Sequence, residues 1–448
     1  MGLDPEELRR NREARAAQRR QQEMERKKLF IRLAIAALVI LVCGTIIFVV
    51  SKNSGENPDV QMEIPQTEAV QTVPTEMTEE ATEKATEATS RWDVDATTVI
   101  HIKAAGDLNI TDSVVASGAT AMGYDFTKAF MDVAPILSDA DLTMMNFEGN
   151  VCGAPYGTNS VSAPQELLQA LRAAGVDILQ TANSCSVNNG LRGLTSTLGN
   201  IRAAGIEPVG TYATPRDYEN SKGYIICNVQ GIKVAIVAFT KGVGSRGMPT
   251  GNEDCVNLLY EDYATTYKKV NTDKINAILK AAEAEDPDIT IALLHWGSED
   301  NDSISKTQKS IVSLMQKRGV DIIIGTHPHL VQQIEYNEET GSLVAYSLGD
   351  FYGDGVKGGT NYSIILDIEI TMDNTNRDTR VTNFSITPIY TLKENECDTQ
   401  RRVVRIREAM YAYESNYVDR ITSAAYTNME TALKRIEERI KPPVVEED

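Results

Sequence analysis

The fold and the candidate site are both indicated by residues 320–329, which read VDIIIGTHPH. A short apolar run followed by glycine and polar residues is typical of a buried β-strand that ends at a ligand site. His327 and His329 flank a proline, which favours an extended backbone. In an extended segment, residues i and i+2 point to the same side. Because imidazole is the commonest metal ligand, we expect both rings to face one ion.

The same arrangement of an apolar run followed by a polar residue recurs along the chain. The chain has four histidines, so their placement is informative. His101 lies inside an apolar run near the start of the folded region, and we interpret it as structural. The other polar residues at the ends of runs are Asp107, Glu148, Asn183, Cys185 and His295, after the runs 99–105, 141–147, 176–180 and 289–294.

Strand-like and helix-like segments alternate from Val99 onward, which predicts an α/β fold with a largely parallel sheet. The later runs, from 331–336 through 380–391, follow one another closely and should pair antiparallel. The remaining runs expected as strands are 233–239, 321–325, 343–348 and 362–370, and the expected helices are 126–137, 164–174, 191–204, 260–285 and 305–318.

If the strands are neighbours in one sheet, the polar residues at their ends converge on a single crevice. Mixed Asp, Glu, Asn and His ligands suit borderline cations such as Mn²⁺, Fe or Zn²⁺. A bound ion of this kind polarises an anionic oxygen or generates hydroxide near neutral pH. Each residue alone is equally explained as a turn former or a helix cap, so the prediction depends on their convergence.

The N-terminal region predicts a membrane anchor and a tether. Residues 1–28 are strongly basic, and residues 29–50 form an apolar stretch interrupted by Arg32. This length suits a single transmembrane helix, and the basic flank places residues 1–28 in the cytoplasm and the main domain outside. The alternative is a cleaved signal peptide, whose apolar core is usually shorter. Residues 51–96 are rich in Thr, Glu and Ala and predict a disordered stalk.

Net charge and cysteine usage narrow the functional classes further. The formal net charge of −19 argues against a general nucleic-acid binder, which needs a basic surface. Six cysteines are present and none forms a C-x-x-C pair, so neither a zinc knuckle nor a thioredoxin-like motif is expected. One cysteine lies in the predicted anchor, and the remaining five cannot all pair, so at least one should be free or a ligand.

The C-terminal segment 396–448 is expected to be helical and to pack on the domain, or alternatively to bind a partner.

Several of these motifs together carry a family resemblance. Gly106-Asp107, Asn146-Phe147-Glu148, His295-Trp296-Gly297, Gly325-x-His327-Pro328-His329 and Tyr346-Ser347-Leu348-Gly349 occur in order, with Ala182-Asn183 between the second and third. Over residues 99–355 the chain resembles the CapA-type capsule synthesis, or poly-γ-glutamate biosynthesis, family within the calcineurin-like metallophosphoesterase superfamily. The resemblance implies a metallophosphoesterase-like β-sandwich flanked by helices over 97–395, with one or two divalent metal ions at the strand ends. It also implies a membrane-tethered extracytoplasmic protein that serves synthesis or export of an anionic surface polymer, with the polymer, its synthase and export subunits as partners.

The resemblance also implies roles for individual residues. His295 and His327 would be catalytic. Independently of the resemblance, Arg192 and Arg246 are expected in loops near the predicted crevice and, with Asp350, are the candidates for substrate binding. The implied metal-site residues are Asp107, Glu148, Asn183, Cys185, His295, His327 and His329.

The chain departs from the family pattern at two places. Asn183-Ser184-Cys185 stands where Asn-Asn-His is usual, and Asn188 stands where an aspartate is usual. Asp350 replaces the usual asparagine after Ser-Leu-Gly. Cys185 either ligates a soft metal as thiolate or leaves the site impaired. An active hydrolase, a non-catalytic polymer-assembly component and a sensor with a degenerate fold therefore all remain open.

Overall fold

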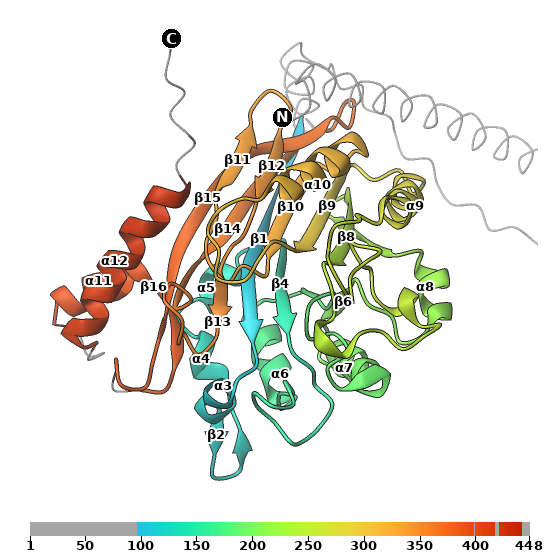
Figure 1. The fold of residues 1–448 in the computed structure, drawn as a ribbon. Coiled ribbons are helices and arrows are strands. Elements are labelled where there is room, and N and C mark those ends of the chain that lie inside the picture. Colours follow the sequence, from blue (N-terminus) through green and yellow to red (C-terminus); the bar gives the residue numbers. More distant parts are fainter. Residues whose placement is uncertain (1–95, 398, 417–420, 441–448) are drawn as a thin grey trace, which may run out of the picture. The chain divides into compact units, whose positions relative to one another are not determined.

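The computed structural model describes residues 96–397, 399–416 and 421–440, which are coloured in Figure 1. The predicted mixed α/β fold is confirmed: two β-sheets pack against each other, and helices cover their outer faces. The predicted basic tail, transmembrane helix and stalk, residues 1–28, 29–50 and 51–96, lie outside the described residues, apart from Ala96. Within the described part, no helix is both long and apolar enough to cross a bilayer.

The larger sheet supplies the carboxylate side of the candidate site. Its strands are β1 (Thr97–Asn109), β4 (Leu142–Glu148), β5 (Ile178–Gln180), β6 (Glu207–Val209), β13 (Asp350–Tyr352), β14 (Tyr362–Asp373), β15 (Thr379–Leu392) and β16 (Arg402–Arg405). Their order is β16-β15-β14-β1-β4-β5-β6, and β13 pairs with β1 outside this path. β1 runs parallel to β4 and β13 and antiparallel to β14. The carboxyl ends of β1 and β4 therefore lie at one edge of the sheet.

The smaller sheet supplies the histidine side. Its strands are β7 (Tyr224–Val229), β8 (Ile232–Thr240), β9 (Ile289–His295), β10 (Ile322–Thr326), β11 (Ile334–Asn337) and β12 (Ser342–Ala345). Their order is β11-β12-β10-β9-β8-β7. Strands β8, β9, β10 and β12 are mutually parallel, so their carboxyl ends also share one edge. A separate small hairpin joins β2 (Ala119–Thr120) and β3 (Gly123–Tyr124).

The helices lie mostly on the outer faces of the sheets. They are α3 (Asp112–Ser117), α4 (Thr127–Phe130), α5 (Ala134–Leu137), α6 (Glu166–Ala173), α7 (Gly190–Ala203), α8 (Pro215–Ser221), α9 (Thr272–Glu283), α10 (Lys306–Lys317), α11 (Ile406–Glu414) and α12 (Ser423–Ile440). The start of α10 is fixed by a capping box, in which the Ser305 and Gln308 side chains each accept a hydrogen bond from the other residue's backbone N–H.

The apolar run of β10 shows how the layers are built. Ile322 and Ile324 belong to the core between the two sheets, whereas Ile323 belongs to the core formed with α9 and α10. Alternate residues of a strand point to opposite faces, so a strand buried on both faces needs a continuous apolar run. Such a strand has a fixed place in the sheet, and it therefore positions the residues that follow it.

Two of the predicted helices differ from the sequence-based expectation. The helix expected over 260–285 begins only at Thr272, because the Asp262 carboxylate accepts hydrogen bonds from the backbone N–H groups of Lys268 and Lys269 and closes a loop instead. The helix expected over 126–137 is divided into α4 and α5.

The C-terminal segment packs on the domain, which was one of the two arrangements predicted for it. It contributes β16 to the larger sheet before α11 and α12 begin. Figure 1 shows α12 alongside β15. Ala425, Met429, Ala432 and Ile436 of α12 are buried in the core shared with both sheets.

Candidate metal centre

Polar side chains from both sheets meet where the parallel strands end. Glu148 is the last residue of β4 and His295 the last residue of β9, and His327 follows β10 directly. Asp107 lies near the end of β1, and its Oδ2 accepts a hydrogen bond from the backbone N–H of His327 at 3.1 Å. Chain segments far apart in sequence are thus joined by direct bonds between the two sheets. The convergence predicted for these residues is present.

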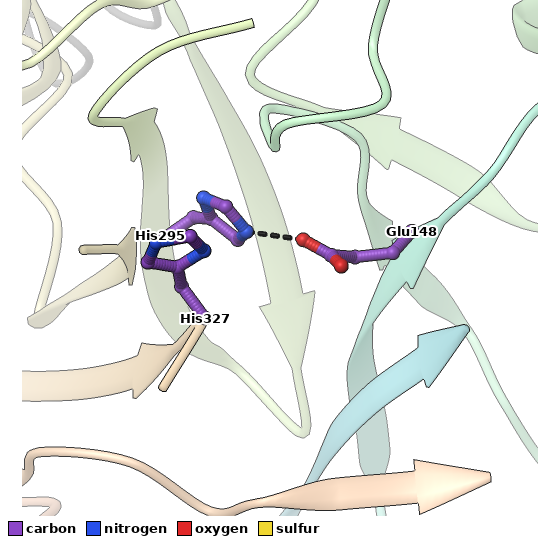
Figure 2. Close-up of side chains that lie close together, drawn as sticks. All are labelled: Glu148, His295 and His327. Atoms are coloured by element: carbon purple, nitrogen blue, oxygen red, sulfur yellow. Dashed lines mark hydrogen bonds and ion pairs between the residues drawn. The ribbon is translucent and has the colours of Figure 1, made fainter. Parts of the chain in front are cut away.

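Glu148, His295 and His327 form the first donor group, shown in Figure 2. All three are buried, and one ligand atom from each lies within 4.8 Å of the others. Glu148 Oε1 is hydrogen-bonded to His295 Nε2, and the His295 and His327 ring centroids are 4.4 Å apart. Thr240 Oγ1, at the end of β8, lies 3.1 Å from His295 Nδ1 and fixes the orientation of that ring.

Asp107, His329 and Asp350 form a second donor group beside the first. His329 Nδ1 lies 2.7 Å from Asp350 Oδ1 and 3.7 Å from Asp107 Oδ2. The two carboxylates come from register partners on the adjacent strands β1 and β13. Asp350 was a candidate for substrate binding, and the structure places it in contact with His329 and almost fully buried.

Glu299 was missed by the sequence analysis. Its carboxylate forms a third donor group with His327 and His329, on the exposed side of the site. Glu299 lies four residues after His295, in the loop that leaves β9, and no apolar run precedes it directly. The only feature of the sequence that could have identified Glu299 was its position in the loop that directly follows His295.

The local backbone around His327 differs from the extended segment that was expected. His327 has a φ of 94° and His329 a φ of 60°, both in the region that L residues rarely adopt. The two rings still approach, with centroids 6.1 Å apart. The predicted extended backbone was therefore wrong, although the two rings do lie close together. Strained backbone of this kind persists only where the surroundings fix it, and it is common at functional sites.

Burial and mutual charge shift the pKa values of the carboxyl groups. Burial raises the pKa of Asp107, and the nearby Glu148 adds to this shift. Burial also raises the pKa of Asp350, to about 7, against the opposing effect of its hydrogen bond to His329. Burial acts on Glu148 in the same direction, but the charge of His295 and its hydrogen bond outweigh it and hold the pKa of Glu148 below its usual value.

The two tandem histidines are shifted in opposite directions. Burial lowers the pKa of His327, and the charges of His295 and Lys241 lower it further. Burial also acts to lower the pKa of His329, but the hydrogen bond to Asp350 and the charges of the surrounding carboxylates outweigh it and raise the pKa to about 11. His327 is therefore neutral at physiological pH, which is the form of imidazole that binds metals.

The donor set fits a divalent cation. His327 Nδ1 is buried and has no hydrogen-bond partner among the described residues. A buried polar atom without a partner is costly, and an ion is one of the ways to satisfy it. Imidazole and carboxylate ligands together suit Mn²⁺, Fe or Zn²⁺, and these residues do not distinguish between them.

A sequence profile of the family described as "Bacterial capsule synthesis protein PGA_cap" matches residues 101–355, more than half of the chain. The chain belongs to this family. It is similar to "Capsule biosynthesis protein CapA" of Bacillus anthracis, with 26% identity over 243 residues, and to "PGA biosynthesis protein CapA" of Bacillus subtilis (strain 168), with 27% identity over 269 residues. These matches cover 52% and 58% of this chain but only 55% and 64% of the relatives.

Solved structures show more distant similarity to this PGA_cap chain. One is the calcineurin-like phosphoesterase YfkN from Bacillus subtilis, at 15% identity and a TM-score of 0.39, covering 76% of this chain and 98% of that one. Another is described as a novel phosphatase from Mycoplasma pneumoniae, at 13% identity and a TM-score of 0.40, covering 66% of this chain and 94% of that one.

Asn183 takes part in a hydrogen-bonded network of this PGA_cap chain. Its side-chain nitrogen donates to Asn146 Oδ1 at 3.1 Å and to the carbonyl of Phe147 at 2.7 Å. Asn146 in turn donates to Asp107 Oδ1 at 2.5 Å. Asn146, which the sequence analysis did not single out as a functional residue, thereby links Asn183 to the second donor group.

The other predicted residues lie apart from the donor groups or contribute differently. The Cys185 thiol belongs to none of the three groups, and burial, together with Glu148 and Asp107, raises its pKa well above the usual value. Arg192 is exposed on α7. The side chain of Arg246 lies outside the described part of the structure. His101 is hydrogen-bonded to Asp367 at 3.0 Å, in agreement with a structural role.

Proposed function

We propose that this chain is a membrane-anchored, extracytoplasmic PGA_cap protein that acts in synthesis or export of an anionic capsule polymer such as poly-γ-glutamate. We further propose that it holds one or two divalent cations at the strand ends, in the manner of a metallophosphoesterase. The observation that carries the metal site is the buried group of Glu148, His295 and His327, with its unsatisfied imidazole nitrogen. The polymer role is supported by family membership and by the names of the two relatives.

Each residue of the donor groups would have a separate role in binding the cations. Glu148, His295 and His327 would hold the first cation, and Asp107, His329 and Asp350 would hold or orient a second. A bound cation of this kind polarises an anionic oxygen of a phosphoester, ester or amide. Thr240 would keep the His295 ring in place, since partners of metal-bound histidines fix ring orientation and tautomer. Both ring nitrogens of His295 are already engaged, by Glu148 and by Thr240, so His295 would act through the cation it holds. The second ring nitrogen of His327 is the candidate for direct contact with the reacting group.

A second function is favoured by one specific observation. Cys185 stands outside the donor groups, and its raised pKa keeps the thiol protonated near neutral pH. An acid/base group at that position would contribute about 10²–10⁴-fold in rate, and a protonated thiol does not supply it. In this second proposal the domain binds the growing polymer, its synthase or its export subunits without catalysing a reaction.

Metal content tests the first proposal directly. The full chain, purified in detergent without chelator, is expected to contain Mn, Fe or Zn by elemental analysis. Glu148→Gln should lose most of this metal, whereas Glu335→Gln, which alters a carboxylate on the remote strand β11, should retain it. A wild-type chain that neither contains nor takes up these ions would refute the metal site.

Polymer production separates the two proposals. In cells that depend on this chain for surface polymer, the double variant His327→Ala, His329→Ala should abolish the polymer if the site is catalytic. His101→Ala is the matched control, because its imidazole also pairs with a carboxylate but lies outside the donor groups. If the double variant is present at the normal level and polymer is retained, the catalytic proposal is wrong and the assembly role stands.

A further inference from the structure

Lys241 lies directly beside the donor groups, although it belongs to none of them. It follows Thr240 at the carboxyl end of β8, and its backbone N–H donates to the carbonyl of His295 at 2.8 Å. The preceding residue, Thr240, contacts the His295 ring. The position of Lys241 is therefore fixed by the same strand ends that fix the first donor group.

The ammonium group of Lys241 is only partly satisfied. Nζ donates to the carbonyl of Gly297 at 2.7 Å and lies 4.7 Å from the centroid of the Tyr267 ring. The described residues place no carboxylate within 4.0 Å of it. An ammonium group has three N–H donors, and the hydrogen bond to Gly297 uses one. A half-buried cation that keeps free donors and has no carboxylate partner among the described residues can form strong charge-assisted hydrogen bonds to an anion.

Lys274 provides an internal comparison. Its Nζ also lies 4.7 Å from a tyrosine ring, that of Tyr218, but it is paired with Asp254 Oδ1 at 3.0 Å and bonded to the carbonyl of Val256. The two lysines share the aromatic contact and differ in the carboxylate. The ion pair therefore satisfies Lys274 within the fold, whereas Lys241 remains available.

The charge of Lys241 reaches the donor groups. Its positive charge contributes to lowering the pKa of His327, and Glu299 acts electrostatically on Lys241 itself. Another cation near the site, Lys357, is paired with Asp300 at 2.6 Å and is largely exposed. Among the described residues, Lys241 is thus the lysine best placed to bind a ligand that also contacts His327.

We propose that Lys241 binds an oxyanion of the substrate, a carboxylate or phosphate group, and holds it next to the donor groups. This inference rests on the proposed function and specifies how the site recognises its ligand. The chain carries a net charge of −19, so its overall field does not attract a polyanion. A local cation at the strand ends supplies the attraction where it is needed. The Tyr267 ring forms part of the same subsite and attracts the ammonium group of Lys241 through a cation–π contact.

Anion affinity of the full chain tests this proposal. Binding of inorganic phosphate and of γ-glutamyl-glutamate is measured by calorimetry with Mn²⁺ present, for wild type, Lys241→Met and the matched control Lys274→Met. We expect Lys241→Met to weaken binding of at least one anion by about tenfold or more, because a charge-assisted hydrogen bond is lost. Lys241→Arg should restore most of the affinity. Metal content should not change, and the anion that responds identifies the source of the oxyanion.

Several outcomes would overturn the proposal. The proposal is wrong if Lys241→Met and Lys274→Met bind the anions with equal affinity. It is also wrong if the wild-type chain binds neither anion. Lys241→Met that loses thermal stability but keeps wild-type anion affinity would assign Lys241 a structural role through Gly297. If wild type holds no metal, the proposed metal site fails separately, and the comparison of the two lysine variants in the metal-free chain still decides the role of Lys241.

Discussion

Replacement of Gly325 by alanine tests how the strands set the position of the histidines. Gly325 precedes Thr326 and His327 on β10. A Cβ atom at this position would lie 2.0 Å from the carbonyl oxygen of Tyr346 and 2.5 Å from Trp296 Nε1. Neither neighbour can move freely, because one is backbone and the other donates a hydrogen bond to that same carbonyl at 2.9 Å. The strand itself must therefore shift.

The expected cost follows from these contacts. Overpacking of a core typically costs about 1–3 kcal/mol, and loss of the hydrogen bond from Trp296 to Tyr346 adds about 1 kcal/mol. We therefore expect Gly325→Ala to lower the free energy of unfolding by about 2–4 kcal/mol. Because β10 moves away from Tyr346, His327 moves with it, and metal affinity should fall as well.

Urea denaturation of the full chain measures this cost, and Gly199→Ala is the control. Gly199 lies in α7, where an added Cβ meets nothing within 4 Å. The same chemical change should there raise the free energy of unfolding by about 0.5–1 kcal/mol, since alanine is the better helix former. The reasoning fails if the free energy of unfolding of Gly325→Ala lies within about 0.5 kcal/mol of the wild-type value, which is the range of neutral surface substitutions.

Three further predictions concern the second donor group, the C-terminal helix and the cysteines. Asp350→Asn should weaken metal binding by about 10–100-fold in chelator competition, as loss of the carboxylate partner of a histidine does, whereas Asp367→Asn, which removes the equivalent partner of His101, should not. Met429→Ala should lower the free energy of unfolding by about 2–5 kcal/mol in urea, since this side chain is fully buried; a loss below about 1 kcal/mol would mean that α12 is only loosely attached. All five described cysteines are free, so mass spectrometry after alkylation in denaturant without reductant should find each one labelled. Before denaturation Cys227 should react more slowly than an ordinary thiol, because burial raises its pKa and lowers its thiolate fraction at a given pH.

The sequence predicted the parts of the fold that are buried on both faces. A strand such as β10 needs an uninterrupted apolar run, and such a run is visible without any knowledge of its neighbours. The loop before α9 was not predictable in this way. The helical spacing of its residues is compatible with a helix, and the competing hydrogen bonds of the Asp262 carboxylate decide against it.

The same distinction applies to the candidate site. Asp107, Glu148 and His295 were identifiable because each lies where an apolar run stops. Asn146 was not, because it lies within β4 and its role depends on a hydrogen bond to Asp107. Glu299 was not, because it enters the site from an exposed loop whose course is fixed by tertiary contacts.

The distribution of charge within the site is the strongest reason to expect a cation there. Asp107, Glu148 and Asp350 are all less than a tenth exposed. A buried carboxylate is costly unless an opposite charge lies beside it. His295 pairs with Glu148, and His329 pairs with both Asp107 and Asp350, while Asp107 also accepts hydrogen bonds from Asn146 and from the backbone N–H of His327. One imidazolium cannot neutralise two carboxylates, whereas a divalent cation can. The fold thus holds together a set of groups whose charge a bound divalent cation would balance.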